Sequence, residues 1–284
     1  MATMLGVLGD SYRRQLRRPG DRPPVEIVAG KAADLAREFG LSPFGVDFGT
    51  RGLKGADAAA LLDLRSRLTA ANLVPTVIVG SLLLHADEEL SEPPLADAIE
   101  NLAVASALGS PLALFYFGYG GRVNREGRVR LATQQVRRLA DAAAAYGITV
   151  TTENYDYFTS DDFLRIFRQV EQPNVGLHVD TGNWLLLGED PLEATAKMAP
   201  HTFHAHVRDY VLRDGVYASV PIGQGVLDWE PMLAALGTIA AGRDRFVLAA
   251  EMDLDSGDPA AEDAATRECV RYLAAWWNTA SGAA

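Results

Sequence analysis

The chain alternates between short apolar runs and longer amphipathic stretches. The short runs are rich in β-branched and aromatic residues and predict strands at 4–8, 44–48, 76–79, 112–117, 149–153, 175–180, 203–207 and 246–251. The amphipathic stretches predict helices at 25–39, 57–71, 95–108, 129–146, 161–170, 191–198, 229–239 and 259–277. Strand and helix therefore alternate along the whole chain.

Signals at the helix ends support this interpretation. Ser160, followed by two aspartates, is typical of a helix start, and Asp258 is an N-cap residue before a proline. Gly40, Gly109 and Gly147 follow helical stretches, where a left-handed residue commonly ends a helix.

Eight βα units with continuous apolar strands predict a parallel sheet covered by helices. The count of eight, with a final helix, favours a single (β/α)₈ TIM barrel over an open doubly wound sheet. Linkers, low-complexity segments and charge blocks are absent from the sequence. We therefore expect an α/β protein with one barrel domain over residues 1–284.

Four residues with carboxylate or imidazole side chains lie at the ends of the last four predicted strands. They are Glu153, Asp180, His206 and Glu251. In TIM barrels the carboxyl ends of the strands form the face that holds the active site. Two glutamates, an aspartate and a histidine make an oxygen-rich ligand set that suits a hard divalent cation. We therefore predict one metal ion, Mn²⁺ in the first place, with Mg²⁺ and Co²⁺ as alternatives.

Alternation along the strands places further polar side chains near these four. His178 shares a strand face with Asp180, and His204 and Arg208 share one with His206. If the ligands point into the barrel, His178 and His204 lie one layer deeper and Arg208 lies at the mouth. We expect His204 to be a buried, hydrogen-bonded histidine. His178 has either a core role or a substrate contact, and Arg208 contacts substrate or forms a salt bridge to a loop carboxylate.

The motifs around these residues resemble those of the xylose isomerase-like TIM barrel superfamily, the sugar phosphate isomerase/epimerase family. They are Glu-Asn-Tyr at 153–155, Asp-Thr-Gly-Asn at 180–183, His-Val-Arg-Asp at 206–209, Pro-Ile-Gly-Gln-Gly at 221–225, and Glu251. The resemblance implies that Glu153, Asp180, His206 and Glu251 bind one divalent metal. It also implies that Glu153 and Glu251 exchange a proton with the carbon beside a substrate carbonyl.

Two positions depart from the family pattern. Many sugar epimerases carry histidine where Asn183 stands, and a Gly-Glu-Gly turn where Gln224 stands. Asn183 and its neighbour Trp184 are candidates for substrate contact. The Trp184 ring suits stacking on a sugar or an aglycone, and it equally suits packing under a loop.

These observations predict a divalent-metal-dependent isomerase or epimerase that acts on a sugar or polyol-derived ketone through an enediolate. The alternative is a metal-dependent lyase on the same site, either an inosose-type dehydratase or a 3-oxo-glycoside or C-glycoside eliminase. Both reactions begin with proton removal beside a carbonyl, so the sequence leaves both open.

Composition weighs against other classes of function. The net charge of −11, from 26 basic and 37 acidic residues, disfavours a nucleic acid partner. Only five histidines are present, which argues against the three-metal chemistry of endonuclease IV. No lysine ends a predicted strand, so Schiff-base chemistry is excluded. The intact ligand set argues against a non-catalytic sugar-binding barrel.

The hydropathy pattern carries no signal for a membrane. No apolar run approaches about 18 residues, and no leader-like segment precedes the first predicted strand. We expect a cytoplasmic protein whose partner is a small-molecule carbohydrate, and a homo-oligomer is compatible with the sequence. Cys269 lies in the predicted amphipathic helix at 259–277, and we expect it to be a small core residue.

Overall fold

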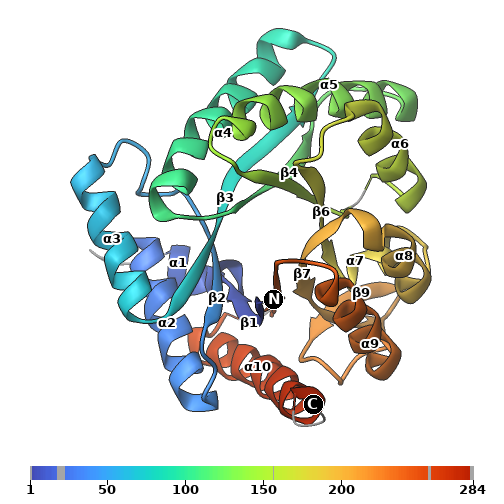
Figure 1. Ribbon diagram of the computed structural model, residues 1–284. Coiled ribbons are helices and arrows are strands. Elements are labelled where there is room, and N and C mark those ends of the chain that lie inside the picture. Colours follow the sequence, from blue (N-terminus) through green and yellow to red (C-terminus); the bar gives the residue numbers. More distant parts are fainter. Residues whose placement is uncertain (1, 18–22, 156, 255–256, 282–284) are drawn as a thin grey trace.

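The computed structural model describes residues 2–17, 23–155, 157–254 and 257–281. Within these residues, parallel strands close into a barrel in the order β1-β10-β7-β6-β5-β4-β3-β2. Their bounds are β1 Ala2–Leu8, β2 Phe44–Gly49, β3 Leu73–Leu84, β4 Leu112–Tyr119, β5 Thr149–Glu153, β6 Val175–Asp180, β7 Thr202–Val207 and β10 Arg245–Ala250. The predicted (β/α)₈ barrel is confirmed (Figure 1).

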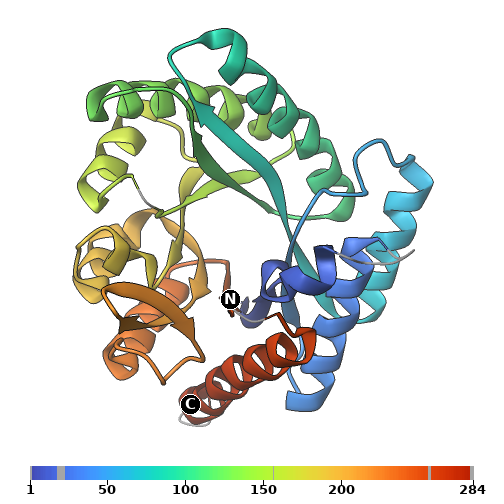
Figure 2. The same cartoon turned by 180° about the vertical axis from the view of Figure 1, so that it is seen from behind.

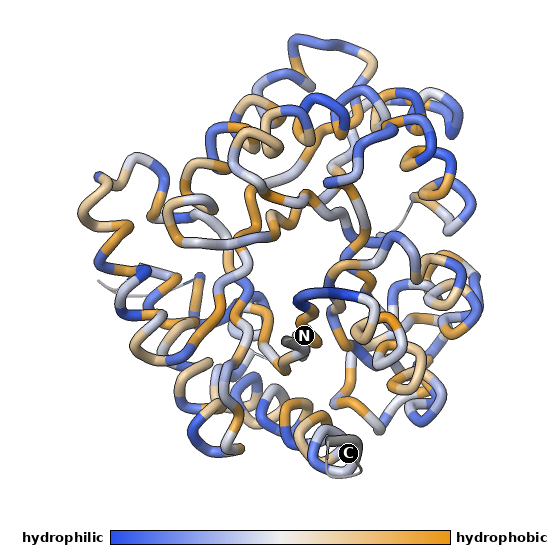
Figure 3. The backbone as a smooth tube through the Cα atoms, in the orientation of Figure 1, coloured by the Kyte–Doolittle hydropathy of each residue, from blue (hydrophilic) through white to orange (hydrophobic). Residues whose placement is uncertain are grey.

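Helices surround the barrel on its outside (Figure 1). The long ones are α2 Pro24–Phe39, α3 Ala58–Ala70, α4 Glu88–Leu108, α5 Arg125–Ala144, α6 Ser160–Val170, α8 Pro191–Met198, α9 Trp229–Ala241 and α10 Pro259–Ser281. Short ones are η1 Gly9–Tyr12, α1 Arg13–Arg17, α7 Asn183–Leu186 and η2 Ala199–His201. Apolar positions gather along the strands and on the helix faces that meet them (Figure 3). Across the described part of the chain, no helix has both the length and the apolarity of a membrane span.

The ends of several elements follow the predicted signals. Gly40, Gly109 and Gly147 adopt positive φ angles of 65°, 75° and 65° just beyond α2, α4 and α5. Asp258 Oδ1 accepts a hydrogen bond from the Ala260 backbone N–H (2.9 Å) at the start of α10. The prediction for α6 was wrong by one residue. Its N-cap is Thr159, because Thr159 and Asp162 form a reciprocal capping box.

A β-hairpin was not predicted. Directly after β7, strands β8 (Asp209–Arg213) and β9 (Val216–Val220) pair as an antiparallel hairpin. Asp214 and Gly215 link them with φ angles of 50° and 79°, which is the two-residue turn that suits a hairpin. The hairpin follows the carboxyl end of β7, and α1 follows β1 and η1, so both lie at the face of the barrel formed by the carboxyl ends of the strands (Figure 2).

Side chains alternate between the inside and the outside of the barrel. On β2, Phe44, Val46 and Phe48 pack outward into the main hydrophobic core. Inside the barrel, Met4, Val247 and Ala249 form a separate small apolar cluster. Glu251 comes two residues after Ala249 and directly after the end of β10, where the alternation of Val247 and Ala249 continues. The barrel interior therefore changes from apolar to polar toward its carboxyl end.

Candidate active site

The four predicted metal ligands meet at the carboxyl end of the barrel. One carboxylate oxygen from each of Glu153, Asp180 and Glu251 lies within 4.8 Å of the other two. His206 Nδ1 lies 3.2 Å from Glu153 Oε1 and 3.1 Å from Glu251 Oε2. Glu153 ends β5, Asp180 ends β6, His206 belongs to β7 and Glu251 follows β10. Adjacent and near-adjacent strands thus bring all four side chains into one cluster.

Two neighbouring side chains hold these strand ends in register. Asn154 Nδ2 donates to the Asp180 carbonyl (2.9 Å), and Asn154 Oδ1 accepts from the Asp180 N–H (2.7 Å). Thr181 donates its N–H to the His206 carbonyl (3.1 Å). Its hydroxyl donates to the Arg208 carbonyl (2.8 Å) and accepts from the Arg208 N–H (2.9 Å). Asn154 therefore fixes β5 to β6, and Thr181 fixes β6 to β7.

The backbone after β6 orients the Asp180 carboxylate. Its Oδ1 accepts hydrogen bonds from the N–H groups of Gly182 (2.8 Å) and Asn183 (3.0 Å), which leaves Oδ2 facing the cluster. A side chain at Gly182 would lie 2.6 Å from the Tyr210 ring. Glycine is therefore required there, because Tyr210 packs directly against the turn.

Arg208 lies inside the cluster. Its Nε is 3.2 Å from Asp180 Oδ2, and its Nη2 pairs closely with Glu251 Oε1. Its Nη1 donates to the Tyr210 hydroxyl (2.8 Å), which donates to Asn183 Oδ1 (3.1 Å). Arg208 thus forms salt bridges, but its partners are two of the predicted metal ligands. Asn183 supports the guanidinium through Tyr210.

The three carboxylates of the cluster outnumber its positively charged side chains. Burial raises the pKa of Asp180 to about 6, although the positive charge of Arg208 opposes the shift. Burial alone would lower the pKa of His206, but hydrogen bonds to Asp47 and Glu153 raise it to about 9. Asp180 Oδ2 and Glu251 Oε2 are buried and accept no hydrogen bond from any described residue. Unsatisfied carboxylate oxygens beside a histidine nitrogen are the donor set that a divalent cation needs.

A second polar layer lies below this cluster. His178 and His204 are fully buried, and their ring centroids lie 4.9 and 5.3 Å from that of His206. Burial lowers the pKa of His178 well below its usual value, so its ring is neutral. His204 Nε2 lies 2.7 Å from Asp47 Oδ2, which agrees with the buried, hydrogen-bonded histidine that the sequence predicts. Asp47 itself was not predicted.

Comparison with known proteins decides the family. A family model described as "Xylose isomerase-like TIM barrel" matches residues 33–275. The chain belongs to this family. Among curated proteins it is 27% identical over 157 residues to an inosose dehydratase of Geobacillus thermodenitrificans, which is 48% of this chain and 51% of that protein. Two curated relatives match over only 39% and 51% of their own lengths.

Solved structures of the family share this fold across nearly the whole chain. The D-psicose 3-epimerase of Clostridium cellulolyticum H10, solved with D-tagatose, superposes with a TM-score of 0.73 at 16% identity, over 95% of this chain and 96% of that one. The IolI protein with a zinc atom gives 0.75 at 16% identity, over 97% and 98%. At this level of identity the likeness establishes the fold.

The Pro-Ile-Gly-Gln-Gly segment at 221–225 has a structural role in this chain. The Asp209 carboxylate accepts hydrogen bonds from the N–H groups of Gly223 (3.0 Å) and Gly225 (2.9 Å), and from Trp229 Nε1 (2.8 Å). A side chain at Gly225 would lie 2.0 Å from Asp209 Oδ1. Gln224 Nε2 points to the surface and donates to Glu268 (2.7 Å). The glycines therefore let the loop wrap around Asp209.

The structure places two more aromatic residues around the barrel mouth. Trp184, in α7, is fully buried, and its Nε1 donates to Thr195 Oγ1 of α8 (3.2 Å), so its ring is turned toward α8. Tyr116, on β4, was not singled out from the sequence. Its ring packs edge-on against His178 with centroids 5.6 Å apart, and burial raises the pKa of its hydroxyl well above the usual value. A neutral Tyr116 hydroxyl therefore lies beside the polar layers.

Proposed function

We propose that this protein is a divalent-metal-dependent isomerase or epimerase of a sugar or polyol-derived ketone. The observation that supports it is the convergence of the three buried carboxylates of Glu153, Asp180 and Glu251 on one another, with His206 Nδ1 beside two of them. Of their oxygens, Asp180 Oδ2 and Glu251 Oε2 accept no hydrogen bond from any described residue. Solved structures with the same barrel include a D-psicose 3-epimerase and a zinc-containing IolI protein.

The cluster suits one metal ion held by Glu153, Asp180, His206 and Glu251. Three of these ligands offer carboxylate oxygens, which suits Mn²⁺, with Mg²⁺ and Co²⁺ as alternatives. When bound, the ion would polarise a substrate carbonyl and stabilise the negative charge of the enediolate.

Glu153 and Glu251 are the proposed proton carriers. They come from β5 and β10, which lie three positions apart around the barrel, so they approach the centre from different directions. Their exposed fractions are 8% and 7%, whereas Asp180 and His206 are fully buried. These two carboxylates are thus the ones that a substrate at the mouth can reach. One can remove a proton from one face of the α-carbon, and the other can return a proton to the opposite face.

The surrounding polar residues would orient the substrate. Arg208 carries its charge at the same mouth, and the Tyr210–Asn183 chain holds its guanidinium in place. A guanidinium there suits the oxygen that gains charge in the enediolate. His178 is neutral and lies below the reacting carboxylates, so its contribution as a substrate contact would be a hydrogen bond rather than a charge.

The proposal is tested by solvent deuterium exchange. The protein is loaded with Mn²⁺ and incubated in D₂O with a ketohexose such as D-psicose or D-fructose, and separately with an inosose. Deuterium is expected at the carbon next to the carbonyl, and chelation of the metal should stop its uptake. A protein that binds no divalent ion, or that exchanges equally well after chelation, contradicts the proposed function.

A lyase on the same site is the second candidate, because the chain is similar to the Geobacillus inosose dehydratase. It shares the first step, in which a carboxylate removes the α-proton. It differs in the second, when a substituent leaves the neighbouring carbon and a conjugated ketone forms. Ultraviolet absorbance of the inosose reaction separates the two, since elimination creates a chromophore and epimerisation does not.

A further inference from the structure

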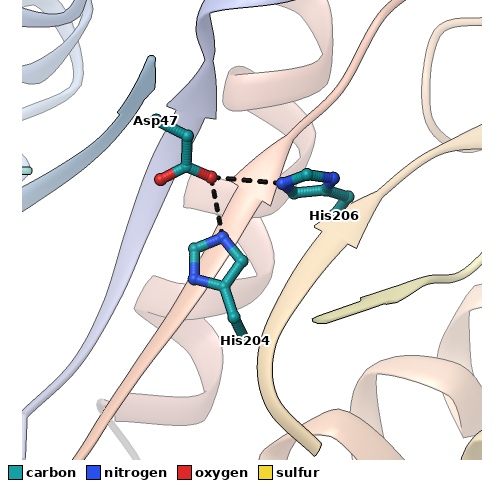
Figure 4. A group of neighbouring side chains, drawn as sticks. All are labelled: Asp47, His204 and His206. Atoms are coloured by element: carbon teal, nitrogen blue, oxygen red, sulfur yellow. Dashed lines mark hydrogen bonds and ion pairs between the residues drawn. The ribbon is translucent and has the colours of Figure 1, made fainter. Parts of the chain in front are cut away.

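Asp47 connects the lower polar layer to the proposed metal ligand. It lies in the middle of β2, whereas His204 and His206 belong to β7, three positions away around the barrel. Asp47 Oδ2 lies 2.7 Å from His204 Nε2 and 3.3 Å from His206 Nε2 (Figure 4). All three side chains are fully buried. One carboxylate oxygen therefore contacts both histidines across the barrel.

This contact determines which nitrogen of His206 faces the carboxylates. An ionised carboxylate only accepts hydrogen bonds, so the Nε2 atoms that contact Asp47 carry protons. The opposite nitrogen, Nδ1, is the one that lies 3.2 Å from Glu153 Oε1 and 3.1 Å from Glu251 Oε2. A cation among the carboxylates would take the place of the Nδ1 proton, while the other proton would stay on His206 Nε2, which donates it to Asp47 Oδ2 in a hydrogen bond.

We propose that Asp47 is a positioning residue for the metal site. Asp47 accepts a hydrogen bond from His206 Nε2 and so directs the Nδ1 lone pair of His206 at the ion. His204 donates to the same Asp47 oxygen and keeps that carboxylate in place. Buried carboxylates that accept a hydrogen bond from a ligating histidine orient the ring and strengthen its donor nitrogen. The inference rests on the proposed function and adds to it a residue from the opposite side of the barrel.

A purely structural role is the competing explanation, since a buried charged pair also affects folding. Two further readings of the geometry weigh against it. Asp47 contacts both His204 and His206 through the same oxygen, Oδ2. Its other oxygen, Oδ1, accepts no hydrogen bond from any residue in the described ranges. Asp47 also reaches the side of His206 that lies opposite the carboxylate cluster. Both features match orientation of the ring rather than general packing.

The experiment compares metal affinity in a graded series. Asp47→Asn keeps the shape and an acceptor oxygen but loses the charge, and Asp47→Leu loses both. Asp162→Asn is the matched control, because Asp162 is equally buried but caps α6 and pairs with Arg125 away from His206. Mn²⁺ affinity and stoichiometry are measured by titration, and melting temperatures by circular dichroism. The ¹⁵N-histidine NMR spectra of Zn²⁺-loaded protein report the protonated nitrogen of His206.

The expected loss of Mn²⁺ affinity is about tenfold for Asp47→Asn and up to about 100-fold for Asp47→Leu. Asp162→Asn should lower the melting temperature and leave the affinity unchanged. In the wild type, His206 should keep its Nε2 proton when the metal is bound. Equal Mn²⁺ affinity in all variants would overturn the inference and leave the proposed function intact. A second ion per chain that is lost with Asp47 would also overturn it, because Asp47 would then be a ligand. A wild type that binds no ion would overturn the proposed function and this inference with it.

Discussion

The barrel interior contains two buried polar layers that use the same residue types and reach opposite electrostatic outcomes. The lower layer pairs one carboxylate, Asp47, with His204 and the inner side of His206. The upper layer brings Glu153, Asp180 and Glu251 together around Arg208 and the outer side of His206. His206 belongs to both layers, because its Nε2 faces Asp47 and its Nδ1 faces Glu153 and Glu251.

The pKa values express this difference. Burial would raise the pKa of Asp47, but the two histidines outweigh burial and hold it well below the usual range. In the upper layer burial prevails, and the pKa of Asp180 rises to about 6 despite Arg208. The lower layer thus places its one carboxylate against two histidines, whereas the three carboxylates of the upper layer share, among the described residues, only Arg208 and His206 as positive partners. Counter-charge, rather than burial or residue type, separates a carboxylate held by its own partners from a carboxylate cluster that suits a cation.

The largest predicted effect concerns Glu153 and Glu251, the proposed proton carriers of the upper layer. Glu153→Gln and Glu251→Gln keep the size and an oxygen ligand but remove the basic group. Each should lower deuterium uptake beside the carbonyl by about 10²–10⁴-fold. Glu262→Gln is the control, because Glu262 is also buried but its carboxylate accepts hydrogen bonds from the Arg14 backbone N–H and belongs to none of the candidate metal-ligand groups among the described residues.

Isotope distribution decides between the mechanisms. If product forms at the full rate without solvent deuterium, a hydride shift replaces proton transfer. That result would leave the proposed metal site unchanged, but it would show that neither Glu153 nor Glu251 carries the proton.

Arg208 tests whether the upper layer really has surplus negative charge. Arg208→Gln leaves Asp180 and Glu251 without their positive partner, so the metal-free protein should lose about 3 kcal/mol of unfolding free energy. With Mn²⁺ bound the loss should be much smaller, since the ion supplies the missing charge. Denaturant unfolding with chelator and with Mn²⁺ measures both. Arg165→Gln, which breaks an exposed pair with Glu126, should cost about 0–1 kcal/mol in both conditions. Equal losses for Arg208→Gln with and without metal would contradict the charge argument.

The pH dependence of metal binding is the next smaller effect. The pKa of His206 is about 9 in the metal-free protein, so below that pH an incoming divalent ion must displace a proton. Mn²⁺ affinity should therefore rise about tenfold per pH unit from pH 7 to pH 9 and then level off. The slope should steepen below about pH 6, where Asp180 also binds a proton.

The same groups set the stability of the metal-free protein. The pKa of His206 is raised from 6.5, so its stabilising contribution is complete below pH 6.5 and is lost as the pH rises toward 9. The metal-bound protein lacks this titration and should keep its stability across that range. Melting curves of both forms between pH 6 and pH 9 check the sign, and a metal-free protein that gains stability over the range would contradict it.

The sequence predicted the upper layer better than the lower one, for a physical reason. Glu153, Asp180, His206 and Glu251 stand at strand ends, and the ends of parallel strands in a barrel converge wherever the helices lie. A residue's place at the end of a predicted strand therefore also predicts that it lies near the other three. Asp47 stands in the middle of a strand and meets His204 over a separation of 157 residues. That contact depends on the tilt and stagger of the closed barrel, which no local pattern contains.

Even so, a signal for Asp47 was present. A charged residue within the apolar run FGVDFG cannot be buried without a partner, so it predicts a polar contact inside the barrel. The β8–β9 hairpin likewise had its Asp214-Gly215 turn, but the exposed Leu212 and Val216 on its strands carry no clear core-facing alternation. For Asp47, what the sequence could not supply was the identity of its distant partners, His204 and His206.

The smallest predicted effect concerns Trp184, which belongs to neither layer. Its ring is fully buried and its Nε1 donates to Thr195, so Trp184→Phe should cost about 1 kcal/mol of stability through the lost hydrogen bond. KM and kcat should stay unchanged, because the ring has no exposed surface for a substrate. Trp229→Phe is the comparison, since Trp229 donates to the charged Asp209 and should cost about 2 kcal/mol. A severalfold rise in KM for Trp184→Phe with an unchanged melting temperature would show instead that Trp184 contacts substrate, and that the site extends beyond the two layers toward α7.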